Sequence, residues 1–201
     1  MAKPDRRTAR TRAAVMSAFI AILLDEGYES LTVERIVQGA NVGRSTFYLH
    51  FKSKEDILRQ SMARPSSVLA VLVGNELPRE AVTAQLRHFH DQRRRNRIFF
   101  ESPVRAIWVK CLADLIEPRL ATLARHLRVR PALPPALAAL QIAEAQIGLV
   151  SHWLTLKPSL GAETVGDALV ATTRAATAAL LGAAPGTDLK IPGERLAVRQ
   201  E

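Results

Sequence analysis

The chain has 201 residues, 48% of them hydrophobic and 23% charged, so it can bury one large core or two smaller ones. Its formal net charge of +9 points to a polyanionic partner, most often nucleic acid, although an arginine-rich background composition gives the same sum. The single cysteine, Cys111, excludes an internal disulfide and favours a reducing compartment, and the apolar run from Ala18 to Leu24 is too short to span a bilayer. We therefore expect a cytoplasmic protein with no membrane segment.

The first predicted helix follows a basic segment, residues 1–12, in which five Lys and Arg residues are opposed only by Asp5. Apolar residues then recur at spacings of three and four and form one stripe along a helix: Val15, Ala18, Phe19, Ile22 and Leu23. Gly27 stands where a left-handed C-terminal cap is wanted, so the helix is predicted to end there. The basic segment is either a solvated tail or an arm that follows DNA.

Two short helices are predicted next, joined by a tight turn. Thr32 is a good N-cap for the first, and Asn41-Val42-Gly43 stops it, because asparagine tolerates the positive φ that such a turn needs. The second runs from Arg44 to Phe51, with Phe47 and Phe51 on one face, and Ser53 caps a further helix. This arrangement is typical of a helix-turn-helix, whose second helix enters the DNA major groove.

Beyond residue 62, prolines divide the chain into longer predicted helices. Pro65 interrupts or kinks the helix that begins at Ser53, one helix runs from Pro78 to about Asn96, and another begins at Ser102-Pro103 and is disturbed by Pro118. After a proline-marked loop come two long Ala-rich helices, about 136–156 and 162–181. No strand pattern of useful length is present, so the predicted fold is all-α: a three-helix DNA-binding domain joined to a larger helical domain.

Many residues of the N-terminal region stand at spacings shared with one known family. They are Gly27-Tyr28, Leu31-Thr32-Val33 with Ile36, the run from Ala40 to Phe51, and Ser53-Lys54-Glu55. In these positions the sequence resembles the TetR family of bacterial regulators, over about the first quarter of the chain. It departs from the family pattern at Asn41, Gly43 and Ser45, where Gly, Ser and Gly are usual.

The resemblance implies a homodimeric repressor that binds a palindromic operator on double-stranded DNA and releases it when a small-molecule effector enters the C-terminal domain. It implies a DNA-binding domain over 9–69 with its motif at 32–51, and an effector-binding and dimerisation domain over 70–182 that pairs through the last two long helices. The prolines and glycines that follow Gly182 predict a flexible tail over 183–201. By matched position, the residues expected to hold phosphates are Thr32, Thr46, Tyr48 and Lys54, and those expected to approach bases are Arg44, Ser45 and His50. Three of them have plainer alternatives: Tyr48 as a half-buried core aromatic, Thr32 as a cap alone, and His50 facing the supporting helix.

The resemblance also places the effector pocket among the middle helices. Its candidate lining residues are Phe89, Phe99, Phe100, Trp108, Cys111, Leu149, His152 and Trp153, although the same side chains describe a packed core equally well. The run Arg93–Arg97 is interpreted as a solvated helix end, with an anionic effector or DNA flanks as the alternative.

Three other functions compete with this interpretation. Catalysis is disfavoured, because the side chains of His88 and His90 do not converge on one face of a helix. The sequence also has no phosphate-binding loop, nucleophile elbow or paired acids. We therefore expect no catalytic residues, metal or cofactor. A protein that coats DNA without sequence preference would need no long C-terminal domain. A family member that activates transcription, or that answers to no small molecule, remains an alternative.

Overall fold

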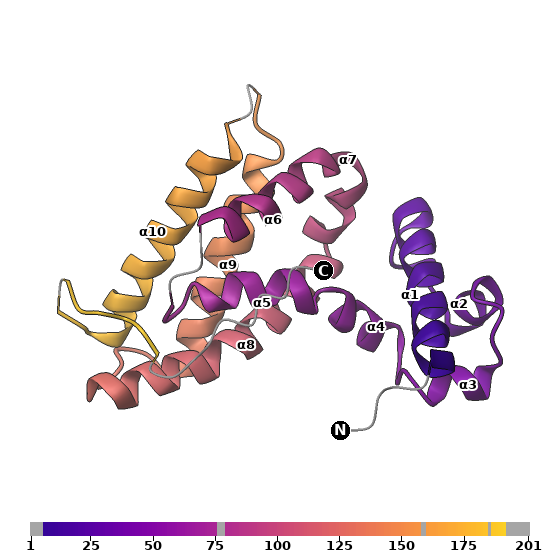
Figure 1. Cartoon of the computed structure of the whole chain (residues 1–201), viewed down its shortest axis with the longest axis horizontal. Coiled ribbons are helices and arrows are strands. Elements are labelled where there is room, and N and C mark those ends of the chain that lie inside the picture. The colour runs from indigo at the N-terminus through magenta and orange to yellow at the C-terminus, as the bar shows by residue number, and fades with distance from the viewer. Residues whose placement is uncertain (1–5, 76–78, 158–159, 185, 192–201) are drawn as a thin grey trace. The chain divides into compact units, whose positions relative to one another are not determined.

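The computed structural model describes residues 6–75, 79–157, 160–184 and 186–191, and every element in these ranges is helical. Contacts divide the chain into two compact units (Figure 1): unit 1 is Met1–Ala63 with Arg94–Ile107, and unit 2 is Arg64–Arg93 with Trp108–Glu201. By contacts, unit 1 also takes in the segment 94–107, and the predicted domain boundary at residue 69 stays a prediction. The all-α architecture predicted from the sequence is confirmed.

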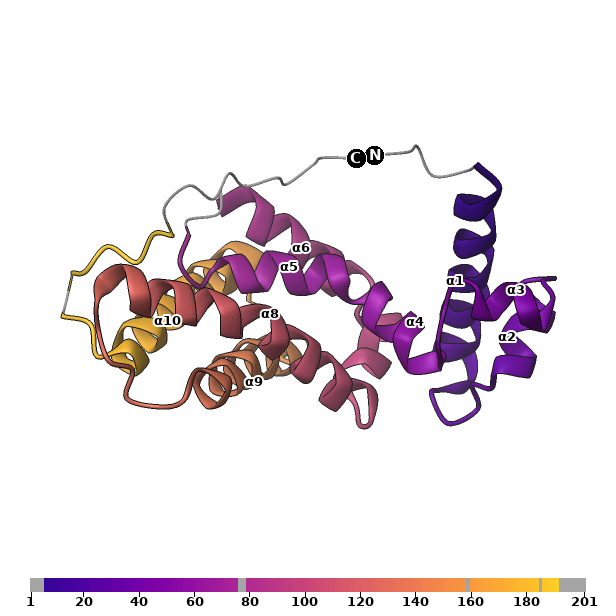
Figure 2. The ribbon, with the colours of Figure 1, turned by 90° about the horizontal axis from the view of Figure 1, so that it is seen from below.

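Unit 1 is built around α1, Arg6–Glu26, whose apolar stripe buries Val15, Phe19 and Leu23. The short helices α2 (Val33–Gly39) and α3 (Arg44–Tyr48) lie on one side of α1 and α4 (Lys54–Ser61) on the other (Figures 1 and 2). The 3-10 helix η1, Arg97–Phe100, also belongs to this unit. Gly27 ends α1 at φ 85°, as predicted from the need for a left-handed cap.

Apart from Ala63 and residues 104–107, which fall in unit 1, unit 2 contains five longer helices: α5 (Ala63–Val71), α6 (Arg79–Asp91), α8 (Val104–Leu127), α9 (Pro135–Trp153) and α10 (Ala162–Leu181). The short α7, Arg93–Asn96, follows α6. Helix α10 packs against α6 and α9, and α5 buries Ser66, Leu69 and Ala70. Within the described residues no helix combines the length and apolar character needed to cross a bilayer.

Of two prolines expected to disturb helices, Pro65 agrees with one of its two expected alternatives, an interruption, whereas Pro118 departs from the expectation. Pro65 lies in the first turn of α5, where the missing N–H has no intrahelical partner, so it marks a new helix rather than a kink. Helix α8 continues through Pro118, against the expected disturbance. Pro118 is exposed while Ile116 and Leu120 are buried, so packing of the inner face holds the two halves of α8 together.

The described part of the predicted tail, residues 183–184 and 186–191, packs against unit 2. Leu189 is buried, and the Ile191 amide donates to the Gly74 carbonyl at 2.7 Å. Apolar side chains at 189 and 191 therefore fasten this segment to unit 2. Residues 192–201 of the predicted tail lie outside the described residues.

Candidate nucleic-acid interface

The turn between α2 and α3 is fixed by local chemistry. The Thr32 hydroxyl accepts from the Arg35 amide at 3.3 Å and caps α2, and Asn41 adopts φ 51°, so both predictions for these residues are confirmed. Gly43 begins α3 without a side-chain cap. The Arg35 guanidinium holds α2 to the end of α1 by bonding to the Glu26 carboxylate, and this bond lowers the pKa of Glu26.

Two phenylalanines hold α3 from behind. Phe47 and Phe51 are fully buried with ring centroids 5.9 Å apart, and the Tyr48 ring meets the edge of Phe47 at 5.2 Å. Tyr48 itself is 50% exposed, so half of its side chain is available to a partner, and its contact with phosphate stays a prediction. The inner face of α3 is thus anchored, and its outer face is open.

The outer face of α3 consists of four exposed residues that follow each other at helical spacing: Arg44, Ser45, Tyr48 and Leu49. We call these four residues the recognition face. Thr46 and His50 are half-buried at its borders, and Thr32 is exposed at the start of α2. Arg44 pairs with Glu34 at 2.8 Å, but both side chains are more than 60% exposed, so this weak pair can be exchanged for a phosphate or a base.

Lys54 has a structural task that the sequence did not reveal. Its ammonium donates to the carbonyls of Tyr28 (3.2 Å) and Leu31 (3.0 Å) and lies 4.4 Å from the centre of the Tyr28 ring. Burial raises the pKa of Tyr28 to about 12, so the ring stays neutral beneath the cation. Lys54 thus ties α4 to the loop between α1 and α2, and its predicted contact with phosphate stays a prediction.

Replacing Lys54 with methionine is expected to lower the free energy of unfolding by about 1–2 kcal/mol, because two charge-assisted hydrogen bonds and a cation–π contact are lost. Urea denaturation followed by circular dichroism measures the change. Lys52→Met is the matched control, since Lys52 is exposed. Equal stability of the two variants would contradict the structural task of Lys54.

Sequence reasoning missed two residues of this region. The Arg12 guanidinium donates to the His50 carbonyl at 3.4 Å and to the Gln60 side chain, and lies 5.1 Å from the centre of the Phe51 ring. It holds the end of the recognition face against α1 and α4, and only the folded chain brings these positions together. Leu49 is 81% exposed. Its spacing of four residues from Ser45 places it on the same helix face, and this spacing was the available signal in the sequence.

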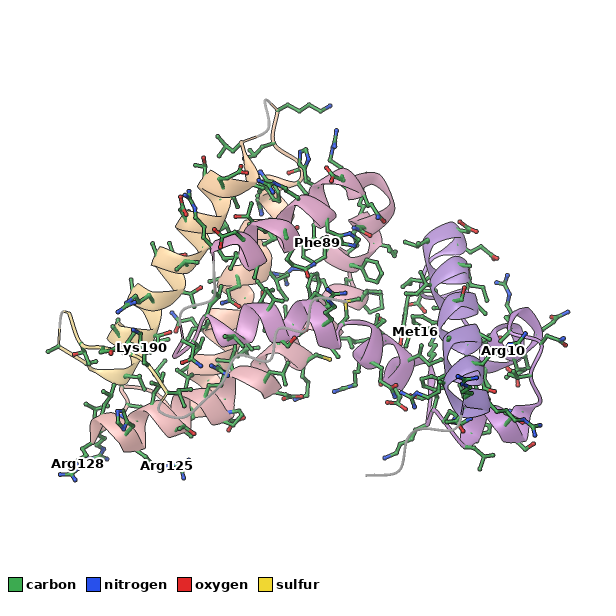
Figure 3. The ribbon with its side chains drawn as sticks, viewed as in Figure 1. Arg10, Met16, Phe89, Arg125, Arg128 and Lys190 are labelled. Carbon is green, nitrogen blue, oxygen red and sulfur yellow. The ribbon has the colours of Figure 1, made fainter. Side chains whose placement is uncertain are left out.

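The predicted effector residues fall in different places. Phe99 and Phe100 are buried in unit 1, whereas the other six belong to unit 2. Phe89 meets Trp108 edge to face at 5.7 Å in the interior of unit 2 (Figure 3), and the Trp108 indole donates to the Ser66 hydroxyl at 3.0 Å. Trp153 is buried, its ring stacks on that of His90 with the ring centroids 5.2 Å apart, and its indole N–H donates to the Leu160 carbonyl. Cys111 and Leu149 are half-buried, and His152 is exposed.

A buried glutamine extends the polar interior of unit 2. Gln146 on α9 is 1% exposed, and its amide nitrogen donates to the Leu69 carbonyl at 3.2 Å and the Thr173 hydroxyl at 3.0 Å. A carbonyl can only accept, so the bond to Leu69 fixes which end of the amide is the donor. The amide oxygen has no hydrogen-bond partner among the described residues. It is therefore a buried acceptor without a donor.

Comparison with known proteins gives a family for the N-terminal region. Residues 16–60 match the family model described as bacterial regulatory proteins, tetR family. The chain is 38% identical over 61 residues to the uncharacterized HTH-type transcriptional regulator YxbF of Bacillus subtilis (strain 168), and the match covers 30% of this chain and 16% of that protein. It is 38% identical over 53 residues to the HTH-type transcriptional regulator TcmR of Streptomyces glaucescens, covering 26% of this chain and 24% of that one. The matched segment thus spans less than a quarter of either relative.

Solved structures resemble the fold over most of the chain. A TetR transcriptional regulator from Streptococcus agalactiae 2603V superimposes with a TM-score of 0.55 and 22% identity, over 84% of this chain and 96% of that one. A TetR-family structure from Syntrophomonas wolfei gives 0.52 and 19%, over 86% and 97%. These similarities show that the chain shares its fold with the two structures.

Proposed function

Because the chain belongs, through its N-terminal region, to the TetR family of transcriptional regulators, we propose that it is a dimeric repressor that binds a palindromic operator and is released by a small-molecule effector. The recognition face of α3 carries the proposal. It is exposed, it is supported from behind by two buried phenylalanines, and it bears an arginine, a serine and a tyrosine that can bond to phosphates and base edges.

Basic residues of α1 extend the surface offered to DNA. Arg6, Arg7 and Arg10 are exposed in the first turns of α1, and Arg12 links this helix to the end of the recognition face. Cations beside a recognition helix hold the phosphate backbone and set register. We propose that the arginines of α1 contact phosphates while α3 contacts bases.

Selection of duplexes from a random library tests the repressor proposal. We expect the full chain to enrich one palindromic sequence and to bind it at least about a thousandfold more tightly than random duplex at physiological salt. Equal affinity for both would support the coating alternative. A transcription assay with the selected site overlapping a promoter separates the remaining choices, since repression lowers the transcript and activation raises it.

The proposed dimer forms through α9 and α10. Three large apolar side chains lie exposed on these helices, Leu137 (50%), Leu140 (42%) and Val170 (38%), among many alanines that let a partner helix approach closely. Pairing with the same helices of a second copy would cover them in a four-helix arrangement. Two copies of α3 would then be presented to two half-sites.

Leu140→Glu is expected to weaken this dimer by about 30-fold, because each copy would bury an unpaired carboxylate. Sedimentation velocity over a concentration series measures the dissociation constant. Leu115→Glu, at a position 41% exposed on α8, is the control. A dimer as strong as that of the unaltered chain would remove α9 from the proposed interface.

The polar interior of unit 2 is the proposed binding site of the effector. Phe89 and Trp108 offer aromatic walls, and Gln146 holds an acceptor without a donor, which costs about 1–3 kcal/mol in a packed interior. An apolar molecule with one hydroxyl or N–H group would satisfy that oxygen. Gln146→Met is expected to leave operator binding intact while abolishing release by any inducer found, which an operator-release assay reads directly.

A further inference from the structure

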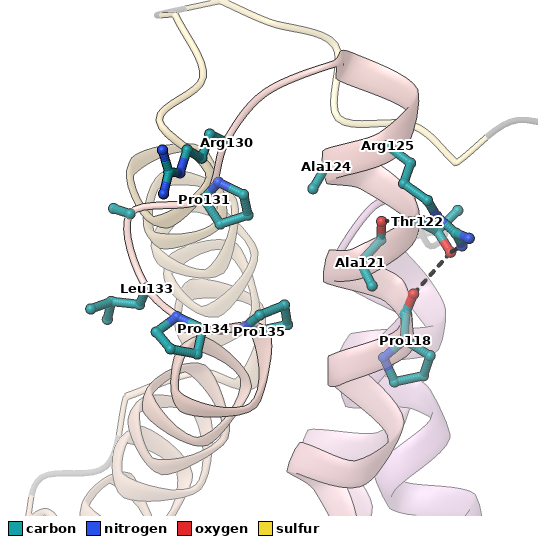
Figure 4. Close-up of a pocket in the computed structure, with 11 residues that line it drawn as sticks. Pro118, Ala121, Thr122, Ala124, Arg125, Arg130, Pro131, Leu133, Pro134 and Pro135 are labelled. Atoms are coloured by element: carbon teal, nitrogen blue, oxygen red, sulfur yellow. Dashed lines mark hydrogen bonds between the residues drawn. The ribbon is translucent and has the colours of Figure 1, made fainter.

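A basic groove at one end of unit 2 is formed by residues other than those of the recognition face and of the proposed effector site. It has a volume of about 670 Å³ and is formed by the C-terminal half of α8 and the loop that leads into α9 (Figure 4). Ala121 and Ala124 line the α8 wall, and Pro131 and Leu133 line the loop wall. The interior of the groove is therefore largely apolar.

Positive charge surrounds this apolar lining. Arg125 on α8 and Arg130 on the loop line the groove, and Arg125 and Arg128 extend from the end of α8 (Figure 3). Between Glu117 and Glu144 the sequence contains four arginines, one histidine and no acidic residue. The side chains of Arg128 and Arg130 make no ion pair or hydrogen bond with the part of the chain that the structure describes.

Helix electrostatics explain only part of this charge. Arg125 and His126 suit the negative C-terminal end of α8, but Arg130 lies beyond the helix and needs another reason. Arg128 adopts φ 54°, a left-handed conformation in which glycine is preferred, so an arginine is present there at a conformational cost. The N-terminal end of α9, at Pro134 and Pro135, opens on the same groove and adds its positive dipole end.

The groove is held in shape by its backbone. The Ala132 amide donates to the Leu180 carbonyl of α10 at 2.9 Å, which fixes the loop, and the prolines restrict it further. Arg125 bonds to the Ala121 carbonyl at 3.3 Å and the Thr122 hydroxyl at 3.2 Å, two neutral acceptors that an anion would replace. The walls of the groove are therefore already ordered, so a ligand loses little binding free energy in ordering them.

We propose that this groove binds a small amphipathic anion: an apolar body with one carboxylate, sulfonate or phosphate group, whose charge lies between Arg125 and Arg130. Charge complementarity selects the anionic group, and the alanine, leucine and proline lining selects the apolar body. The proposal does not depend on DNA binding, since the groove lies wholly within unit 2.

A matched pair of fluorescent probes tests the proposal on the full chain. Anilinonaphthalene sulfonate is an apolar body with one anionic group, and phenylnaphthylamine is the same body without it. We expect the sulfonate to bind at one saturable site per chain, and its affinity to fall when NaCl rises from about 0.05 to 0.5 M. We also expect the double variant Arg125→Gln, Arg130→Gln to bind the sulfonate at least about tenfold more weakly. Phenylnaphthylamine binding is expected to be the same for both proteins.

The control is Arg64→Gln, Arg93→Gln, which removes the same charge from two other exposed arginines of unit 2. It should bind the sulfonate like the unaltered chain. The proposal is overturned if the groove variant keeps full affinity for the sulfonate, or if the control variant loses affinity equally. Tighter binding of phenylnaphthylamine than of the sulfonate would also overturn it.

Discussion

Phe47→Ala is expected to lower the free energy of unfolding of unit 1 by about 3–5 kcal/mol, the usual cost of emptying a buried phenylalanine site. Phe47 is fully buried and contacts both Phe51 and Tyr48, so its removal leaves a cavity behind the recognition face. Unit 1 is small, and a loss of this size is comparable with the whole stability of a typical small domain. Operator binding should therefore be lost together with the fold of α3.

Circular dichroism during urea denaturation, together with amide hydrogen exchange resolved to α1–α4, separates this effect from a change in unit 2. We expect rapid exchange in unit 1 and unchanged exchange in unit 2. Leu49→Ala is the matched control, because a side chain 81% exposed contributes within about 0.5 kcal/mol to stability. If Phe47→Ala keeps slow exchange in α2 and α3, the two phenylalanines do not hold the helix in place.

The helix-turn-helix could be predicted because its determinants are local. Thr32 caps the helix it precedes, Asn41 takes the positive φ of the turn it occupies, and Phe47 and Phe51 lie one turn apart on the same face. Each of these signals operates within about one turn of helix, and so it is visible in the order of residues alone. The N-terminal elements therefore agree with the sequence expectation.

Contacts between distant segments could not be predicted in the same way. Arg12 reaches His50 and Gln60, and Lys54 reaches Tyr28, only after α1 and α4 have packed. In the sequence alone, Arg12 differs in no visible way from the other cations of residues 1–12, and the position of Lys54 indicates a phosphate contact rather than a bond to Tyr28. Likewise, Pro118 appears to a sequence reader as a helix breaker, because the buried neighbours that hold α8 together belong to the tertiary structure.

The predicted effector residues also show what cannot be predicted from the sequence alone. The candidate lining residues between Phe89 and Trp153 rest mainly on aromatic residue type, and the structure places Phe99 and Phe100 in unit 1 and Phe89 with Trp108 in unit 2. Gln146 is not among these candidates, although its buried acceptor is the more specific feature. Residue type identifies a candidate for a pocket, but only burial and hydrogen bonding show which polar group inside it lacks a partner.

The double variant Tyr48→Ala, Leu49→Ala is expected to bind the selected operator about 100-fold more weakly than the unaltered chain, while affinity for random duplex changes by less than about threefold. Both side chains are exposed in the free protein and would be covered by DNA, and neither carries charge, so the nonspecific electrostatic part of binding stays. Gel shifts at fixed moderate salt measure both affinities. Leu115→Ala, at a position 41% exposed on α8 and outside the proposed dimer interface, is the control for loss of an exposed leucine.

Thymine methyl groups offer a sharper test of Leu49. The C5 methyl of thymine is the apolar group on the major-groove edge of a base pair, and an exposed leucine on a recognition helix is a suitable partner for it. Replacing the contacted thymine with uracil in both half-sites should weaken binding of the unaltered chain by about 15-fold, about fourfold for each methyl group. Leu49→Ala should bind the thymine and uracil duplexes equally, because the partner of the methyl group is already absent. If every uracil replacement leaves the unaltered chain at full affinity, Leu49 contacts no thymine, and recognition depends on the polar residues of the face alone.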